Sequence, residues 1–236
     1  MNAELAHQSG FSDIYANISL EENLAFFSGI SFSDLIEFIP IPVENILLLK
    51  SDYITEKSWR GFDILEGRDD ISGLLRDNIH RFGDFACLDY NDIDAIKQLK
   101  NEQIAELLYL AHIHEPLISP HFEVLQNRFV YLSHDNGWYS KLFFKELQIP
   151  RTILINKIKK TIQHVIRNDE YSLPNDLIEV VEDLSMKGLL ITIDLSMQRR
   201  KIYTVKLYEV GKHQNPDALF NSVEYNKLPV SFEMKL

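Results

Sequence analysis

Half of the eight histidines in this chain lie within 23 residues, from His112 to His134. Imidazole nitrogen and carboxylate oxygen together suit zinc and other divalent metals, and Glu115 lies in the same stretch. If His112 and His114 shared a helix, they would point about 200° apart, so they could bind one ion only if the helix ended just before them. The competing interpretation is that these side chains are packed, capping or exposed in loops. A metal-dependent hydrolase is therefore an alternative function, with four candidate ligands: His112, His114, His121 and His134.

A second candidate site lies at the tip of an expected β-hairpin, at about residues 128–145. Asn136-Gly137 is the strongest short-range signal for such a hairpin, because both residues tolerate the positive φ of a type I′ turn. With a two-residue loop, His134 faces Tyr139 across the strands. Exposed aromatic side chains at the tip would be anchors for a partner protein, and the competing interpretation is that Trp138 and Tyr139 are core residues. The candidate binding residues are His134, Asp135, Trp138 and Tyr139.

A basic segment forms the third candidate site. Arg199, Arg200 and Lys201 lie in the loop at 196–201, between expected strands at 189–195 and 202–208. A helix followed by such a hairpin is similar to a winged helix, whose basic tip could approach phosphates. The preceding helix, at 175–187, is acidic where a recognition helix should be basic. Nucleic-acid binding is therefore the second alternative, and an ordinary exposed hairpin is the simpler interpretation.

The net charge of −11 is concentrated in the first part of the chain. Residues 1–147 contain 11 Lys and Arg against 24 Asp and Glu. An acidic surface repels nucleic acid and attracts basic proteins, such as nuclease toxins, by charge complementarity. The simpler interpretation is a solvated surface with no partner. We expect a non-enzymatic binding or regulatory protein, of immunity-like or accessory type, whose partner is another protein and which needs no cofactor.

Membrane insertion and secretion are not expected. No apolar run approaches the roughly 18 to 20 residues of a membrane helix. Residues 1–10 lack the basic and apolar segments of a secretory signal. Cys87, the only cysteine, excludes an internal disulfide, and its apolar surroundings are typical of a core position. These features together predict a cytoplasmic protein.

The sequence predicts some of the helices and strands that would position these residues. A helix is predicted with Asn101 as N-cap, ending before Pro116. The capping-box spacing of Ser19 and Glu22 predicts a short helix that Gly29 ends. The buried stripe of the Asn101 helix is assigned by helical spacing to four residues: Ile104, Leu107, Leu108 and Ala111.

The alternation of these elements predicts an α+β fold. Its mixed or antiparallel sheet would contain the central hairpin, with helices on its flanks. Pro150 can begin a helix. A second helix, a hairpin and a terminal strand would follow to residue 236. We expect an acidic lobe at 1–149 and a helix–hairpin lobe at 150–236, either as two domains or as one continuous domain.

Three segments carry a family resemblance: residues 82–85 (FGDF), 102–111 (EQIAELLYLA) and 127–138 (NRFVYLSHDNGW). They are similar to an uncharacterised family of small soluble Gram-positive bacterial proteins, and the resemblance covers about residues 45–145. That family is sometimes labelled an oxalate:formate antiporter, which does not suit a chain with no membrane-spanning run. The resemblance implies kinship and no set of catalytic residues.

Overall fold

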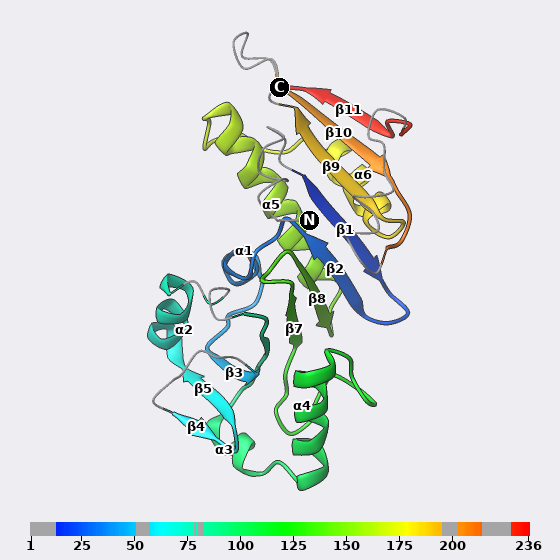
Figure 1. Ribbon diagram of the computed structural model, residues 1–236. Helices are drawn as coiled ribbons and strands as arrows, with labels where there is room; N and C mark the ends of the chain where they lie inside the picture. The colour runs from blue at the N-terminus through cyan, green and yellow to red at the C-terminus, as the bar shows by residue number, and fades with distance from the viewer. Residues whose placement is uncertain (1–12, 51–56, 78, 80–82, 195–202, 214–227) are drawn as a thin grey trace. The chain divides into compact units, whose positions relative to one another are not determined.

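The computed structural model describes residues 13–50, 57–77, 79, 83–194, 203–213 and 228–236 (Figure 1). Six α-helices and eleven strands lie in these segments. Every strand pairing with a defined register is antiparallel, so the predicted α+β class is confirmed. No helix within these segments combines the length and the apolar character that a membrane crossing requires.

The chain divides into two compact units. Unit 1 combines Met1–Glu21, Ala25–Phe38 and Pro150–Leu236, and unit 2 combines Glu22–Leu24 with Ile39–Ile149. One limit of the units coincides with the boundary expected before residue 150. In contrast, Ala25–Phe38, expected in the N-terminal lobe, belongs with the C-terminal residues.

The strands of unit 1 follow the order β11-β10-β9-β1-β2. Strand β1 pairs with β9, with Ile14 opposite Ile191, and this pairing joins the first described residues to the C-terminal part. The strands are β1 (Ile14–Ser19), β2 (Leu24–Ser28), β9 (Leu189–Asp194), β10 (Thr204–Glu209) and β11 (Phe232–Lys235). The helices are α1 (Phe32–Phe38), α5 (Gln148–Ile166) and α6 (Asn175–Ser185).

The helix predicted from Ser19 to Gly29 is wrong. The chain turns between β1 and β2, and Asn23 in that turn has a φ of 47°. Ala25, Phe26 and Phe27 are buried in succession. Consecutive burial is typical of a strand covered on both faces, whereas a helix would bury one stripe. The spacing of a capping box is therefore incidental here.

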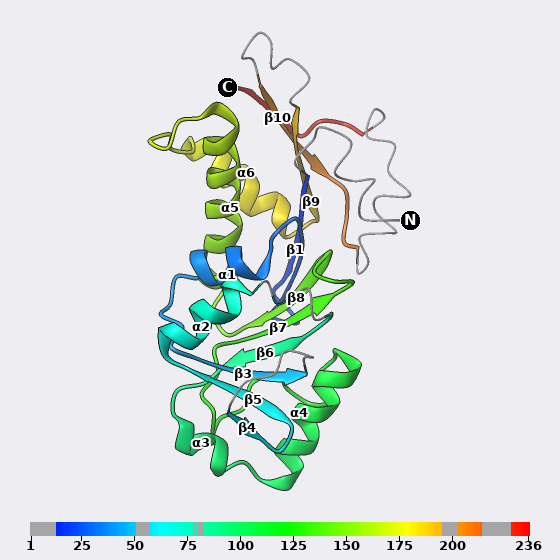
Figure 2. The ribbon, with the colours of Figure 1, turned by 60° about the vertical axis from the view of Figure 1, so that its left-hand side comes forward.

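The strands of unit 2 follow the order β8-β7-β6-β3-β5-β4. They are β3 (Asn45–Lys50), β4 (Ser58–Trp59), β5 (Phe62–Glu66), β6 (Ala86–Asp89), β7 (Phe129–His134) and β8 (Tyr139–Phe144). The helices are α2 (Gly67–Arg76), α3 (Ile93–Lys97) and α4 (Asn101–Ile113). Figure 2 shows α4 beside the strands of this unit, and α4 contacts β3 and β6.

Helix α4 covers an apolar cluster of unit 2. Its residues Ile104, Leu107 and Leu110 pack with side chains such as Leu47 of β3 and Leu88 of β6. Helix α4 runs through Ile113, so it contains His112, and His114 follows as its C-cap. The helix therefore does not end before both histidines, which a site shared by the two would require. Its N-cap is Lys100 and its first helical residue is Asn101, so the helix begins one position earlier than the assignment of Asn101 as N-cap predicts.

The hairpin of β7 and β8 has a tight turn at its tip. His134 lies opposite Tyr139 and Ser133 opposite Ser140, the register that a two-residue loop at Asn136-Gly137 predicts. The backbone N–H of Trp138 donates to the carbonyl of Asp135 at 3.1 Å. Asn136 and Gly137 have φ values of 56° and 83°, as a type I′ turn requires.

Candidate functional site

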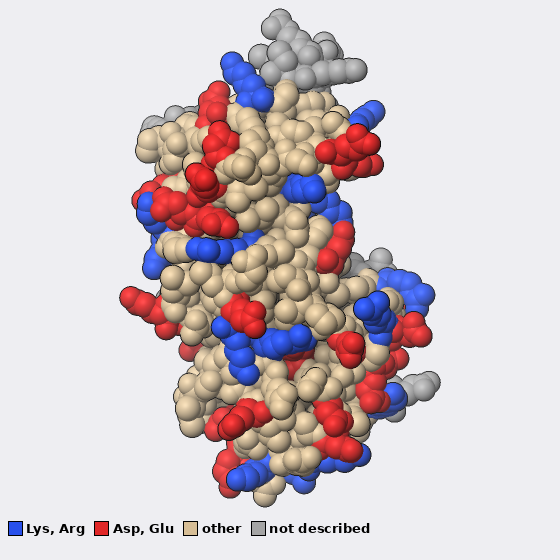
Figure 3. All heavy atoms as spheres, turned by 180° about the vertical axis from the view of Figure 1, so that it is seen from behind, with Lys and Arg blue, Asp and Glu red and all other residues tan. Residues whose placement is uncertain are grey.

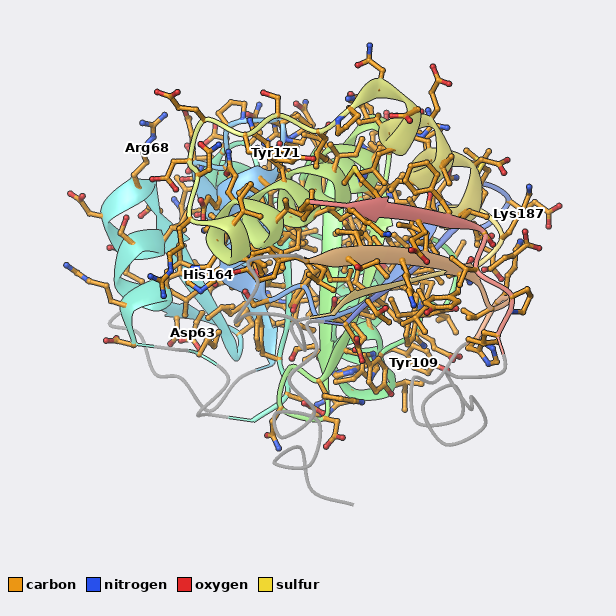
Figure 4. All side chains as sticks on the ribbon, turned by 90° about the horizontal axis from the view of Figure 1, so that it is seen from above. Asp63, Arg68, Tyr109, His164, Tyr171 and Lys187 are labelled. Carbon is orange, nitrogen blue, oxygen red and sulfur yellow. The ribbon has the colours of Figure 1, made fainter. Side chains whose placement is uncertain are left out.

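The outward face of α4 is apolar at its C-terminal end. Leu108 and Tyr109 are 38% and 39% exposed, and Ile113 is 53% exposed; Tyr109 is labelled in Figure 4. Two more apolar side chains follow in the next loop, Leu117 at 60% and Ile118 at 78% exposure. We call these five residues the α4 surface.

This exposure is unusual for a helix that already covers a core. Five of the seven large apolar side chains exposed among the described residues lie in the α4 surface. A surface helix normally carries polar residues opposite its buried stripe, and a helix that is apolar on both sides is normally covered on both. Clustered exposed apolar residues mark contact sites more often than scattered ones do. If solvent alone covered the α4 surface, we would expect polar residues there; instead it is apolar.

The charges around the α4 surface are acidic. Residues 101–126 contain four glutamates and neither Lys nor Arg. Glu102 and Glu106 precede Tyr109 on the same side of the helix by helical spacing. Glu115 lies between Ile113 and Leu117, and Lys141 Nζ approaches its carboxylate at 3.8 Å. On the face in Figure 3, by contrast, acidic and basic side chains are interspersed.

Two of the four candidate metal ligands meet at the C-terminal end of α4. His114 follows Ile113 as the C-cap of α4, with a left-handed φ of 58°. Its Nδ1 lies 3.5 Å from Nδ1 of His134, and the rings meet edge to face with centroids 4.7 Å apart. The other face of His134 stacks on Tyr139, with ring centroids 4.6 Å apart and planes 4° from parallel. The pair links the end of α4 to the hairpin.

The surroundings of His134 favour its neutral form. Burial, with smaller contributions from the positive charges of His114 and Lys141, lowers its pKa to about 4, and Asp84 opposes this shift. At neutral pH one Nδ1 of the pair can therefore donate and the other accept. Two charged rings at this distance would repel each other. The arrangement suits a structural contact and contains no evident nucleophile.

The other two candidate ligands lie elsewhere. His121 Nδ1 is 3.4 Å from the side-chain amide of Asn127, and burial followed by the charge of Lys145 lowers the pKa of His121. His112 is exposed on α4. No group of three or more His, Cys, Asp or Glu within the described segments is placed to hold a metal ion. The structure thus brings together His114 and His134 only.

The hairpin tip is partly exposed. Asp135 is exposed, but Trp138 and Tyr139 are half-buried. The backbone N–H of Asn136 donates to Asp84 at 2.7 Å, which ties the tip to the segment before β6. The proposed nucleic-acid residues Arg199, Arg200 and Lys201 lie outside the described residues.

The α4 surface was missed because helical spacing placed Leu108 in the buried stripe. That assignment is wrong: Leu108 is exposed, and Leu110 is buried. The buried side of α4 is centred on Leu107 and extends to Leu110, whereas Leu108 lies on the opposite flank of Leu107. The usable signal was the surplus of apolar residues, since Leu108, Tyr109 and Ile113 exceed what one stripe can bury. The chain matches no family model, no curated protein and no solved structure.

Proposed function

We propose that this chain is a non-enzymatic protein-binding module and that the α4 surface is its contact site. The exposed apolar cluster at 108–118 carries the proposal. Covering it would remove apolar area from water, which is the main favourable term in protein association. The histidine pair supports the same interpretation, because it holds the turn after Ile113 rather than presenting a reactive group. An immunity-like or accessory role is a finer form of this proposal.

Site-specific photo-cross-linking tests the proposal in the native cell. A benzophenone side chain replaces Ile118, the most exposed residue of the α4 surface, and in a matched control it replaces Arg68, exposed on α2 of the same unit. We expect a discrete adduct with another protein from position 118 and none from position 68, because only the first lies in the contact site.

A second comparison makes that result specific. The same adduct should disappear when Leu108→Ser and Ile113→Ser are introduced together, since these changes remove apolar area without touching the core. Circular dichroism of the doubly substituted chain should be unchanged. The same adduct from positions 118 and 68, no adduct at all, or an adduct that survives both substitutions would contradict the proposal.

A further inference from the structure

The outward face of α4 has the spacing of a helix-packing surface. Ala105, Leu108 and His112 recur at intervals of three and four residues. A parallel row begins with glutamates and ends with Tyr109 and Ile113, at the same intervals. Side chains spaced in this way lie along one side of a helix and can receive a second helix laid along it. A partner helix can therefore lie along this face.

The two ends of this face differ in chemistry. Glu102 and Glu106 occupy the N-terminal half of the row, whereas Tyr109 and Ile113 occupy the C-terminal half. Glu102 is exposed, and Glu106 is half-buried. Three cations lie near the helix but outside the row: Arg60 donates a hydrogen bond to Asn101 at 3.2 Å, Lys100 precedes the helix, and Lys141 approaches Glu115 at 3.8 Å. A helix docked here would place side chains against two carboxylates at one end and against an apolar cluster at the other.

We propose that the partner of the α4 surface is a protein helix whose apolar stripe is bordered by Lys or Arg. This inference rests on the proposed function and specifies the chemistry of the partner. Basic side chains would face Glu102 and Glu106, and the apolar stripe would cover Tyr109 and Ile113. Charge complementarity of this kind fixes orientation and excludes wrong partners more than it adds affinity.

The glutamates of the row disfavour three other partners: a second copy of this chain, a lipid surface and a nucleic acid. A second copy of this chain would bring the same glutamates and no Lys or Arg from 101–126. Anionic lipid surfaces attract basic segments and repel acidic ones. Nucleic-acid backbones likewise require basic side chains, which this face does not contain. A basic amphipathic protein helix is the occupant whose chemistry fits both halves of the row.

Two designed peptides test the partner chemistry directly. Both carry leucine at helical spacing; one carries lysine and the other glutamate at the flanking positions, and each bears a fluorophore for anisotropy titration with the full chain. We expect the lysine peptide to bind and the glutamate peptide to bind at least about tenfold more weakly, because like charges oppose docking. Raising the salt concentration should narrow this difference.

Charge reversal on the protein completes the test. The double substitution Glu102→Lys with Glu106→Lys should weaken binding of the lysine peptide about tenfold and strengthen binding of the glutamate peptide. The matched control reverses two exposed glutamates of the same unit, Glu44→Lys with Glu146→Lys, and should leave the preference unchanged. Circular dichroism confirms that each variant is folded.

The outcomes separate this inference from the proposed function. If neither peptide binds, if both bind equally, or if reversal at 102 and 106 leaves the preference intact, the basic-helix inference is overturned. The cross-link from position 118 decides the proposed function independently, because it requires no particular charge on the partner.

Discussion

Asp89 is a buried carboxylate of unit 2 that accepts several hydrogen bonds. It is 2% exposed and accepts hydrogen bonds from the backbone N–H groups of Arg128, at 2.8 Å, and Phe129, at 3.0 Å. Its other oxygen accepts from Nε of Arg128 at 2.7 Å, and the same guanidinium donates to the carbonyl of Pro42. This carboxylate therefore holds the start of β7 against the end of β6.

Replacing Asp89 should be costly. Asp89→Ala leaves two buried N–H groups and a partly buried guanidinium without their acceptor, and it should lower the free energy of unfolding by about 3 to 5 kcal/mol. The control, Asp94→Ala, breaks an exposed ion pair with Lys97. It should change the free energy of unfolding by less than about 0.5 kcal/mol. Urea denaturation measures both, and equal losses would disprove the assignment.

His134 should make stability depend on pH on the acidic side. Its pKa is about 4 in the folded chain against 6.5 in its ordinary form, so the unfolded state binds a proton first as the pH falls. The contribution of neutral His134 to the free energy of unfolding is fully present above pH 6.5 and is lost as the pH falls from 6.5 to 4. Because the ring is partly accessible, we expect a loss of about 1 to 2 kcal/mol, less than the full shift would give.

A substituted chain isolates that contribution. His134→Gln keeps a polar group facing His114 but does not titrate, so its stability should fall less between pH 6.5 and 4 than that of the parent chain. His112→Gln, at an exposed position, should reproduce the parent profile. Urea unfolding at several pH values compares the three, and parallel curves for all would exclude His134 as the source.

At the scale of elements, two glycines of unit 2 have opposite roles. Gly73 lies inside α2, and a Cβ added there would meet nothing within 4 Å. Gly137 is in the hairpin turn with a φ of 83°, which other residues adopt only with strain. The first glycine is therefore a weakness of its helix, and the second is required by its turn.

Alanine substitutions should separate the two glycines. Gly73→Ala should stabilise the chain by about 0.5 to 1 kcal/mol, because alanine is the better helix former. Gly137→Ala should destabilise it by about 1 kcal/mol or more, because the turn needs a positive φ. Thermal unfolding gives both signs, and shifts in the same direction would contradict this account.

Local rules predicted the elements whose signals are local. The Asn136-Gly137 dipeptide specifies its own turn, and the register of β7 and β8 follows from the length of that turn. The rotation of α4 was not local, since the choice between Leu108 and Leu110 as the buried residue depends on the sheet beneath the helix. The contact of His114 with His134 depends on a left-handed residue that no sequence pattern announces.

At the scale of the whole molecule, unit 1 is assembled from distant segments. The Tyr15 hydroxyl of β1 accepts from the backbone N–H of His213 at 2.8 Å and donates to the carbonyl of Gly211 at 3.1 Å, and burial raises its pKa to about 12. Gly188 also approaches this segment, because an added Cβ would lie 1.8 Å from the Gly211 oxygen. The Tyr15 contacts join residues nearly 200 positions apart, and no local pattern links such residues, so the N-terminal segment was expected in the lobe at 1–149.

Fragments should reflect this organisation. Residues 150–236 alone lack β1, the neighbour of β9, and we expect no cooperative unfolding from them. Residues 39–149 contain all six strands of their own sheet order and should unfold cooperatively. Adding residues 13–38 in trans should restore a transition to the C-terminal fragment. Circular dichroism monitors the unfolding of each fragment. A cooperative transition of residues 150–236 alone would refute this view.

The pairing of β1 with β9 also sets an order for folding during synthesis. Ile14 leaves the ribosome 177 residues ahead of its partner Ile191. At about 5 to 20 residues per second, β1 would wait roughly 10 to 35 seconds for β9. Unit 2 emerges entirely within that interval. We therefore expect unit 2 to be able to fold while β1 still lacks its neighbour β9, so that the apolar side chains of β1 stay accessible to a chaperone during that interval.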